Sequence, residues 1–155
     1  MSKEEEAYIH FQFSIEALNE AWSILKRIKS HPKNSLRIPA FRYALIAYAK
    51  PYRKSFGIEQ PKHSLDTSCI PDEFLELHER LVDSRDQIHA HSDLTLYEPK
   101  LYGDISGPNP FVGYTANYIN VIEELPNIDK IIELIEQTLL RMYKKEPALR
   151  TRLAP

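Results

Sequence analysis

The sequence has one cysteine, no long apolar segment and almost no net charge, and each of these features excludes a class of protein. Cys69 cannot form a disulfide within the chain, which fits a reducing compartment. No apolar run approaches the ~18 residues that a membrane-spanning helix needs. The first residues, MSKEEE, also lack the basic and then apolar order of a secretory signal. We therefore expect a cytoplasmic protein with no membrane partner.

The composition, with 43% apolar and 27% charged residues, is that of an ordinary globular protein, and 155 residues suffice for one domain with one core. The net charge of −2 suggests no partner by itself. The charges are nevertheless unevenly distributed, because segment 26–54 holds nine basic residues and no acidic one, whereas 72–93 is mainly acidic. This asymmetry favours an anionic partner or a complementary subunit surface, although charge blocks also serve solubility alone.

Four segments have apolar residues spaced by three and four positions, which is typical of helices that bury one face. The first begins at a capping-box pattern formed by Ser2 and Glu5 and should run to about residue 31. The second has Ser35 as its expected N-cap, and a proline should kink or end it over 47–50.

The third segment begins at Pro71, with acidic residues in its first turn, and its apolar face leads directly into 85–93. The fourth begins near Asn127 and should end before Pro147. Helices of this number and length predict an all-α fold, an antiparallel helical bundle that forms a single domain over 1–155.

Residues 94–125 do not fit this helical pattern. They hold three glycines and three prolines, and an unstructured loop of that length would be unusual in a compact domain. The stretches LTLYEPKLYG and FVGYTANYINV are rich in aromatic and β-branched residues, so we expect a β-hairpin or an irregular arm after the third helix. Residues 114–125 could equally form a short helix.

The segment RDQIHAHSD, residues 85–93, concentrates an arginine, two histidines and two carboxylates. At 100° per residue, His89 lies about 40° from Arg85 around a helix, and His78 lies about 20° away on the other side. His91 lies about 120° from Arg85. Arg85 and His91 can therefore meet only if the helix loosens near its end or a second copy of the chain contributes its own motif.

Three interpretations of this segment follow from its residues. In a phosphodiester-cleaving site, a guanidinium matches a phosphate and an imidazole moves the protons of a 2′-hydroxyl attack. In a metal site, His89, His91 and Asp93 would be ligands, since HxHxD resembles the start of the metallo-β-lactamase HxHxDH motif. Leu94 replaces the final histidine of that motif, so we expect no metal here. In a structural interpretation, the helix dipole favours the histidines near the C-terminus of the helix, and Arg85 forms ion pairs with nearby acidic residues.

A family resemblance bears on this choice. Arg85 is followed by five residues and then by His91, and the residue after the arginine is Asp86. This pattern resembles the signature of the HEPN superfamily, and the form RD…AHSD is similar in particular to the abortive-infection group of HEPN proteins. HEPN domains are small all-α bundles with the motif toward the end of a late helix, which agrees with the order of helices expected here.

The resemblance implies a homodimer in which two copies of the motif form a shared cleft, commonly that of a metal-independent ribonuclease. Arg85 would hold the scissile phosphate, His91 would transfer protons and Asp86 would orient one of them. His89 has no family role, yet helical spacing puts it nearer to Arg85, so it stays a candidate. Across an isologous interface, Arg85 and His91 need not share one helix face.

RNA and an antitoxin protein are the partners expected for an HEPN-like toxin or defence protein, with no cofactor. The basic block would suit an RNA backbone, while its aromatic residues fit the core better than a stacking surface. The alternative is a non-catalytic dimeric module that binds a nucleotide or a protein, in which Arg85 and His91 are structural. The candidate nucleic-acid-binding residues are Arg42, Lys50, Arg53 and Lys54.

Overall fold

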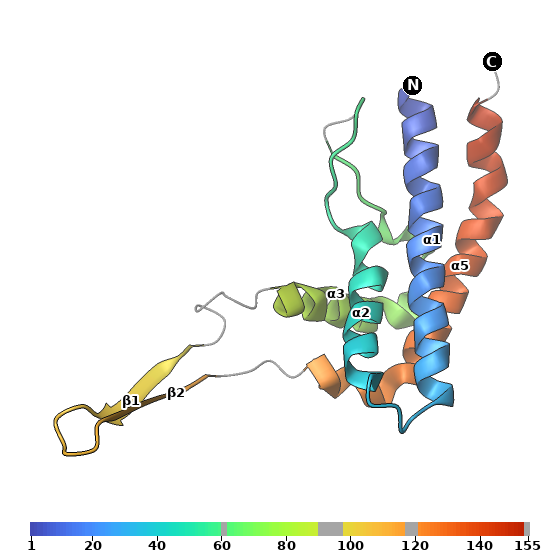
Figure 1. Cartoon of the computed structure of the whole chain (residues 1–155). Helices are drawn as coiled ribbons and strands as arrows, with labels where there is room; N and C mark the ends of the chain where they lie inside the picture. The colour runs from blue at the N-terminus through green and yellow to red at the C-terminus, as the bar shows by residue number, and fades with distance from the viewer. Residues whose placement is uncertain (60–61, 90–97, 117–120, 154–155) are drawn as a thin grey trace.

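The computed structural model describes residues 1–59, 62–89, 98–116 and 121–153, and gives the backbone alone for 86–89 and 121–122. This part of the chain is mainly helical, as the sequence predicts. The long helices α1 and α5 lie side by side, α2 lies against α1, and α3 crosses behind α2 (Figure 1). The described helices are α1 (Lys3–Ser30), α2 (Arg37–Ala49), α3 (Leu75–His89) and α5 (Ile128–Arg150).

The predicted start of α1 is confirmed. The Ser2 hydroxyl accepts a hydrogen bond from the Glu5 amide at 3.1 Å, and the Ser2 amide donates to the Glu5 carboxylate at 2.5 Å. Acidic residues occupy the first turn of α1 and basic residues its last turn, which suits both ends of the helix dipole. The sequence therefore determines locally where this 28-residue helix begins.

The core lies where α1, α2, α3 and α5 meet. Each buried leucine or isoleucine contributes roughly 1.5–3 kcal/mol by leaving water. Two aromatic residues of the basic block, Phe41 and Tyr48, are fully buried, whereas Tyr43 stays exposed. The fully buried side chains include Leu18, Leu25, Phe41, Leu45, Tyr48, Leu81, Ile131, Leu134, Ile135 and Met142.

Two details of the predicted helices are wrong. Leu36, not Ser35, is the N-cap of α2, and no side chain caps that end. Instead, the Asn34 side chain accepts a hydrogen bond from the Leu36 amide, and this bond stabilises the turn that precedes α2. Helix α5 continues through Pro147 to Arg150. The hydrogen bond that Pro147 cannot donate would reach the carbonyl of Tyr143, a half-exposed residue in the last turns, where water can satisfy it.

The predicted β-hairpin is present in the region after α3. Strands β1 (Lys100–Asp104) and β2 (Phe111–Thr115) pair antiparallel and extend away from the helices (Figure 1). A Cβ at Gly103 would lie 2.2 Å from the Phe111 carbonyl oxygen, so only glycine fits there. The alternative of a short helix over 114–125 is wrong at its start, since residues 114 and 115 belong to β2. It is confirmed from residue 121, where the 3-10 helix η4 (Val121–Asn127) leads into α5.

Shorter 3-10 turns join the other elements: η1 (Lys50–Tyr52) ends α2 where a proline stops it, η2 (Thr67–Cys69) and η3 (Asp72–Phe74) precede α3, and η5 (Thr151–Leu153) follows α5. Within the described ranges, no helix is both long enough and apolar enough to cross a membrane.

The buried face of α5 can be tested with two leucines of the same helix. Leu134 is fully buried, whereas Leu140 is 54% exposed. Leu134→Ala should lower the free energy of unfolding by about 2–5 kcal/mol, because it leaves a cavity in the core. Leu140→Ala should change it by less than about 0.5 kcal/mol. Urea denaturation measures both values, and equal losses would contradict the orientation of α5.

Candidate functional site

Helix α3 carries the first half of the arginine–histidine motif, and contacts on two sides fix the position of this helix. Pro71 precedes η3, whose acidic residues suit a helix start, and Leu77 and Leu81 are buried in the core. On the outer side, the Arg80 guanidinium donates to Glu124 at 2.8 Å and to Glu76 at 3.0 Å. These contacts hold α3 between α2 and η4.

A buried polar cluster lies between α2 and α3. The Tyr48 hydroxyl is 2.8 Å from Nδ1 of His78, and the ring of Tyr52 lies 4.4 Å from that of His78, edge to face. Burial lowers the pKa of His78 from 6.5 to about 4, and burial also raises the pKa of both tyrosines. His78 is therefore neutral at physiological pH. It is a packing residue and not a proton donor for the motif.

Arg85 lies two helical turns beyond His78, near the C-terminal end of α3. It is half-buried, and its Nε is shielded from solvent. Two turns correspond to about 10.5 Å along the helix and roughly the same face, so Arg85 follows His78 on the side of α3 that faces the bundle. Figure 1 shows this end of α3 extending beyond α2 before the chain leaves for the hairpin.

The other residues of the motif are less fully described. Asp86 and His89 belong to α3, which is described to His89, but their side chains lie outside the described atoms. His91 lies outside the described residues altogether. The structure thus places Arg85 on a helix as expected, and the partner histidine of Arg85 stays a prediction.

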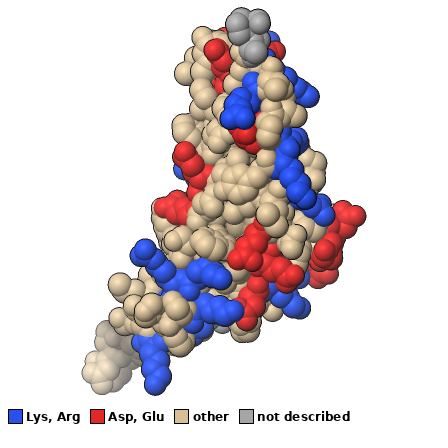
Figure 2. Space-filling view, turned by 90° about the vertical axis from the view of Figure 1, so that its right-hand side faces the viewer, with Lys and Arg blue, Asp and Glu red and all other residues tan. Residues whose placement is uncertain are grey.

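The candidate nucleic-acid-binding residues lie on α2 and on the turn after it. Arg42 is exposed on α2, Lys50 and Lys54 are exposed, and Arg53 is half-buried. The earlier part of the basic block lies at the opposite end of α2. Figure 2 shows Lys and Arg side chains gathered at the end of the molecule where α1 stops. The block is therefore two groups of cations and not one surface.

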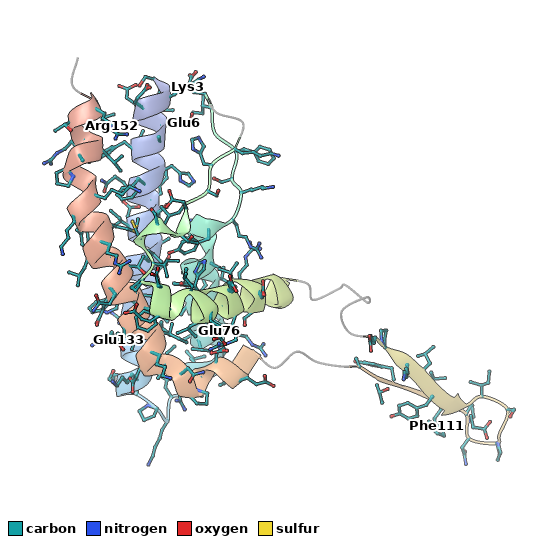
Figure 3. The ribbon with its side chains drawn as sticks, turned by 180° about the vertical axis from the view of Figure 1, so that it is seen from behind. Lys3, Glu6, Glu76, Phe111, Glu133 and Arg152 are labelled. Atoms are coloured by element: carbon teal, nitrogen blue, oxygen red, sulfur yellow. The ribbon has the colours of Figure 1, made fainter. Side chains whose placement is uncertain are left out.

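A second polar cluster, absent from the sequence-based prediction, joins α1 to the segment after η1. The buried Glu6 carboxylate accepts hydrogen bonds from the amides of Ile58 and Glu59, the latter at 2.9 Å. Nε2 of His63 lies 3.3 Å from Glu6. Figure 3 shows Glu6 on α1 beside this segment. Glu6 therefore fixes Ile58, Glu59 and His63 onto the helix.

His10 continues this cluster along α1. Its Nε2 is 2.9 Å from the Ser55 hydroxyl, and its ring stacks on that of His63 at 4.9 Å. Partial burial and the neighbouring His63 both lower the pKa of His10. The Ser55 hydroxyl also donates to the His63 carbonyl at 3.4 Å, so His10 and Ser55 together hold His63 beside α1.

The cluster lines a groove of about 760 Å³ in the described part of the chain. Its walls carry exposed apolar side chains, including Phe13, Phe56 and Ile58, and Lys50 also lines it. Grooves of this size with an apolar wall and a few polar groups are typical ligand sites. In the sequence, this site is indicated only by the four-residue spacing of Glu6, His10 and Ser14, which places three polar side chains on one face of α1. The residues that contact them are distant in the chain and could not be predicted.

Comparisons with protein-family models, with curated proteins and with solved structures find no match. In the part of the chain that the structure describes, no group of three or more His, Cys, Asp and Glu residues is arranged to hold a metal ion. Most of the HxHxD segment lies outside that part.

Glu6→Ala should release the segment that Glu6 holds. Hydrogen bonds to a charged acceptor contribute about 1.5–3 kcal/mol each, so amide hydrogen exchange at Ile58 and Glu59 should accelerate by about tenfold or more. Glu16→Ala is the matched control, since Glu16 is an exposed glutamate of α1 beside the same groove. Unchanged exchange in Glu6→Ala would show that other contacts hold the segment.

The low pKa of His78 should make stability depend on pH. Between about pH 6.5 and pH 4, the unfolded chain binds a proton that the folded chain excludes, so the free energy of unfolding should fall as the pH falls through this window. Below about pH 4 the contribution of His78 is constant. His78→Gln should give a shallower profile in urea denaturation, and His10, which titrates in both proteins, cancels in the comparison.

His31→Gln is the control for this measurement, because His31 is exposed at the end of α1. Its profile should follow that of the parent. Parallel profiles for the parent and His78→Gln would instead show that another group titrates.

Proposed function

We propose that the chain is a HEPN-like, metal-independent endoribonuclease of toxin or defence type, with a site formed by the Arg85 and His91 motifs of two copies. The observation that supports this proposal most directly is the position of Arg85. Its side chain is half-buried at the end of α3, and its Nε is shielded from solvent. Packing restricts the guanidinium to few orientations, which is what a phosphate-holding residue requires.

The proposed reaction needs no group beyond the protein. The RNA 2′-hydroxyl attacks the adjacent phosphorus and loses its proton to a neutral histidine, while the bond to the 5′-oxygen breaks and that oxygen takes a proton from a protonated histidine, such as that of the other copy. The products are a 2′,3′-cyclic phosphate and a 5′-hydroxyl. Arg85 would stabilise the negative charge on the pentacoordinate phosphorus.

A dimer is part of this proposal for a geometric reason. On one helix, Arg85 and His91 would point about 120° apart, too far to act on one phosphate. Two-fold symmetry allows Arg85 of one copy to act with His91 of the other. Lys50 and Lys54 are exposed and would attract the RNA backbone, and an antitoxin protein is a candidate inhibitor.

A second function, a non-catalytic dimeric binding module, is favoured by a separate observation. The large groove over Glu6, His10 and His63 resembles a ligand site and needs no reaction at the motif. In that case Arg85 would serve packing alone. The two functions differ in whether purified protein cleaves RNA.

The decisive experiment incubates the full chain with mixed RNA in EDTA and compares it with Arg85→Ala and His91→Ala. We expect cleavage by the parent and a loss of at least ~100-fold in each variant, the usual size of an acid–base contribution. His89→Ala shows which histidine acts, since only the acting residue is essential. Mass spectrometry of the product ends detects the cyclic phosphate.

Arg80→Lys is the matched control, because Arg80 lies on the same helix and a lysine keeps the positive charge beside Glu76 and Glu124. It should retain parental activity, and circular dichroism should show that all variants are folded. Equal background cleavage in the parent and both motif variants would refute the endoribonuclease and favour the binding module.

A further inference from the structure

The β1–β2 hairpin is the least covered part of the described chain. All five residues of β1 are exposed, as are four of the five of β2. Several of the exposed side chains are large and apolar, such as Leu101 at 81% and Tyr114 at 63% exposure. An isolated two-stranded hairpin is marginally stable in water, and uncovered apolar strands with open edges pair readily with further strands. Both edges of this sheet are open within the described residues.

The register of the hairpin distributes its residues between two faces. Lys100, Tyr102 and Asp104 alternate along β1 and share one face with Phe111 and Thr115 of β2. The ring of Tyr102 leans over Gly113, where a Cβ would lie 2.6 Å from the ring. The ring therefore lies toward β2 and leaves the outer edge of β1 accessible.

The charges on β1 are arranged symmetrically about Tyr102. Lys100 lies two residues before it and Asp104 two residues after it, on the same face. If β1 pairs antiparallel with β1 of a second copy and the two-fold axis passes through Tyr102, each Lys100 lies directly opposite Asp104 of the other copy. Backbone amides of Ser106 and Gly107 donate to Asp104 and hold its pKa below its usual value, so this residue is charged at neutral pH.

The other strand has no comparable signal. β2 carries no charged residue, so its pairing with a second β2 would align no ion pairs. A peptide of unrelated sequence could add to either edge, but it would not explain why opposite charges flank the centre of β1 at equal distances. The charges of β1 therefore favour β1 of a second copy as the strand that pairs at this edge, and they also favour one register.

We propose that two copies of this chain pair through the outer edges of their β1 strands, antiparallel and centred on Tyr102, to form a four-stranded sheet. Two Lys100–Asp104 ion pairs fix the register. The sheet gains the additional strands that a lone hairpin lacks. The contact is small, so we expect a dissociation constant of about micromolar size.

This inference goes beyond the proposed function and is tested by assembly alone. Antiparallel pairing places the Lys100 end of each β1 strand, and with it each set of helices, at opposite ends of the four-stranded sheet. The contact that the proposed function requires between two Arg85 and His91 motifs is therefore a different one. A dimer through β1 that does not cleave RNA would refute the function only. A nuclease whose copies do not pair through β1 would refute this inference only.

The test uses the full chain in sedimentation equilibrium at low ionic strength, with Lys100→Glu and Asp104→Lys as single variants. Each variant alone puts like charges opposite each other twice, so its dimer should weaken by about tenfold or more. A mixture of the two variants restores both opposite-charge pairs, because Glu at 100 faces Lys at 104 and Asp104 faces Lys100. The mixture should dimerise within about threefold of the parent.

The mixture also controls for damage to the hairpin, since a misfolded arm could not be rescued by a second variant. On the parent, a carbodiimide should join Lys100 of one copy to Asp104 of another, and mixing ¹⁴N and ¹⁵N protein identifies the link as intermolecular. A monomeric parent, two variants that dimerise like the parent, or a mixture that stays monomeric would each overturn the proposal.

Discussion

The burial of α1 is the constraint on which the rest of the structure depends. Its apolar face packs against α2 on one side and α5 on the other, and α3 is held in turn by α2 and η4. The same helix supplies Glu6 and His10, which fix the segment after η1. A single 28-residue helix therefore contributes both to the core and to the groove that Glu6 and His10 line.

Features formed by residues that are neighbours in the chain could be predicted from the sequence, whereas features that depend on tertiary contacts could not. The capping box at Ser2 and the apolar spacing of α1 involve neighbours in the chain, so they could be read directly. The end of α5 was predicted wrongly because Pro147 lies near an exposed end of the helix, where water can satisfy the unpaired carbonyl, and that exposure depends on tertiary structure. The hairpin was predictable from residue type, but its register, on which the proposed pairing of two copies rests, was not.

The candidate site shows the same division. The sequence could place Arg85 on a helix, but could not show that His78, on nearly the same face, is enclosed by Tyr48 and Tyr52. Burial, not spacing, removes His78 from acid–base chemistry. The cluster of Glu6, His10, Ser55 and His63 could not be predicted because α1 and the segment after η1, which are distant in the sequence, supply it together and neither carries a recognisable motif.

The separation of the hairpin from the helices has a consequence for how such a chain can diverge. A substitution on β1 changes little in the core, so its effect on folding is small. The charges at 100 and 104 could therefore be exchanged, in duplicated copies of the chain, without loss of the bundle. Each kind of copy would then pair with its own kind, because pairing between the two kinds would place like charges opposite each other. A new specificity of assembly would arise with little effect on the stability of the helices.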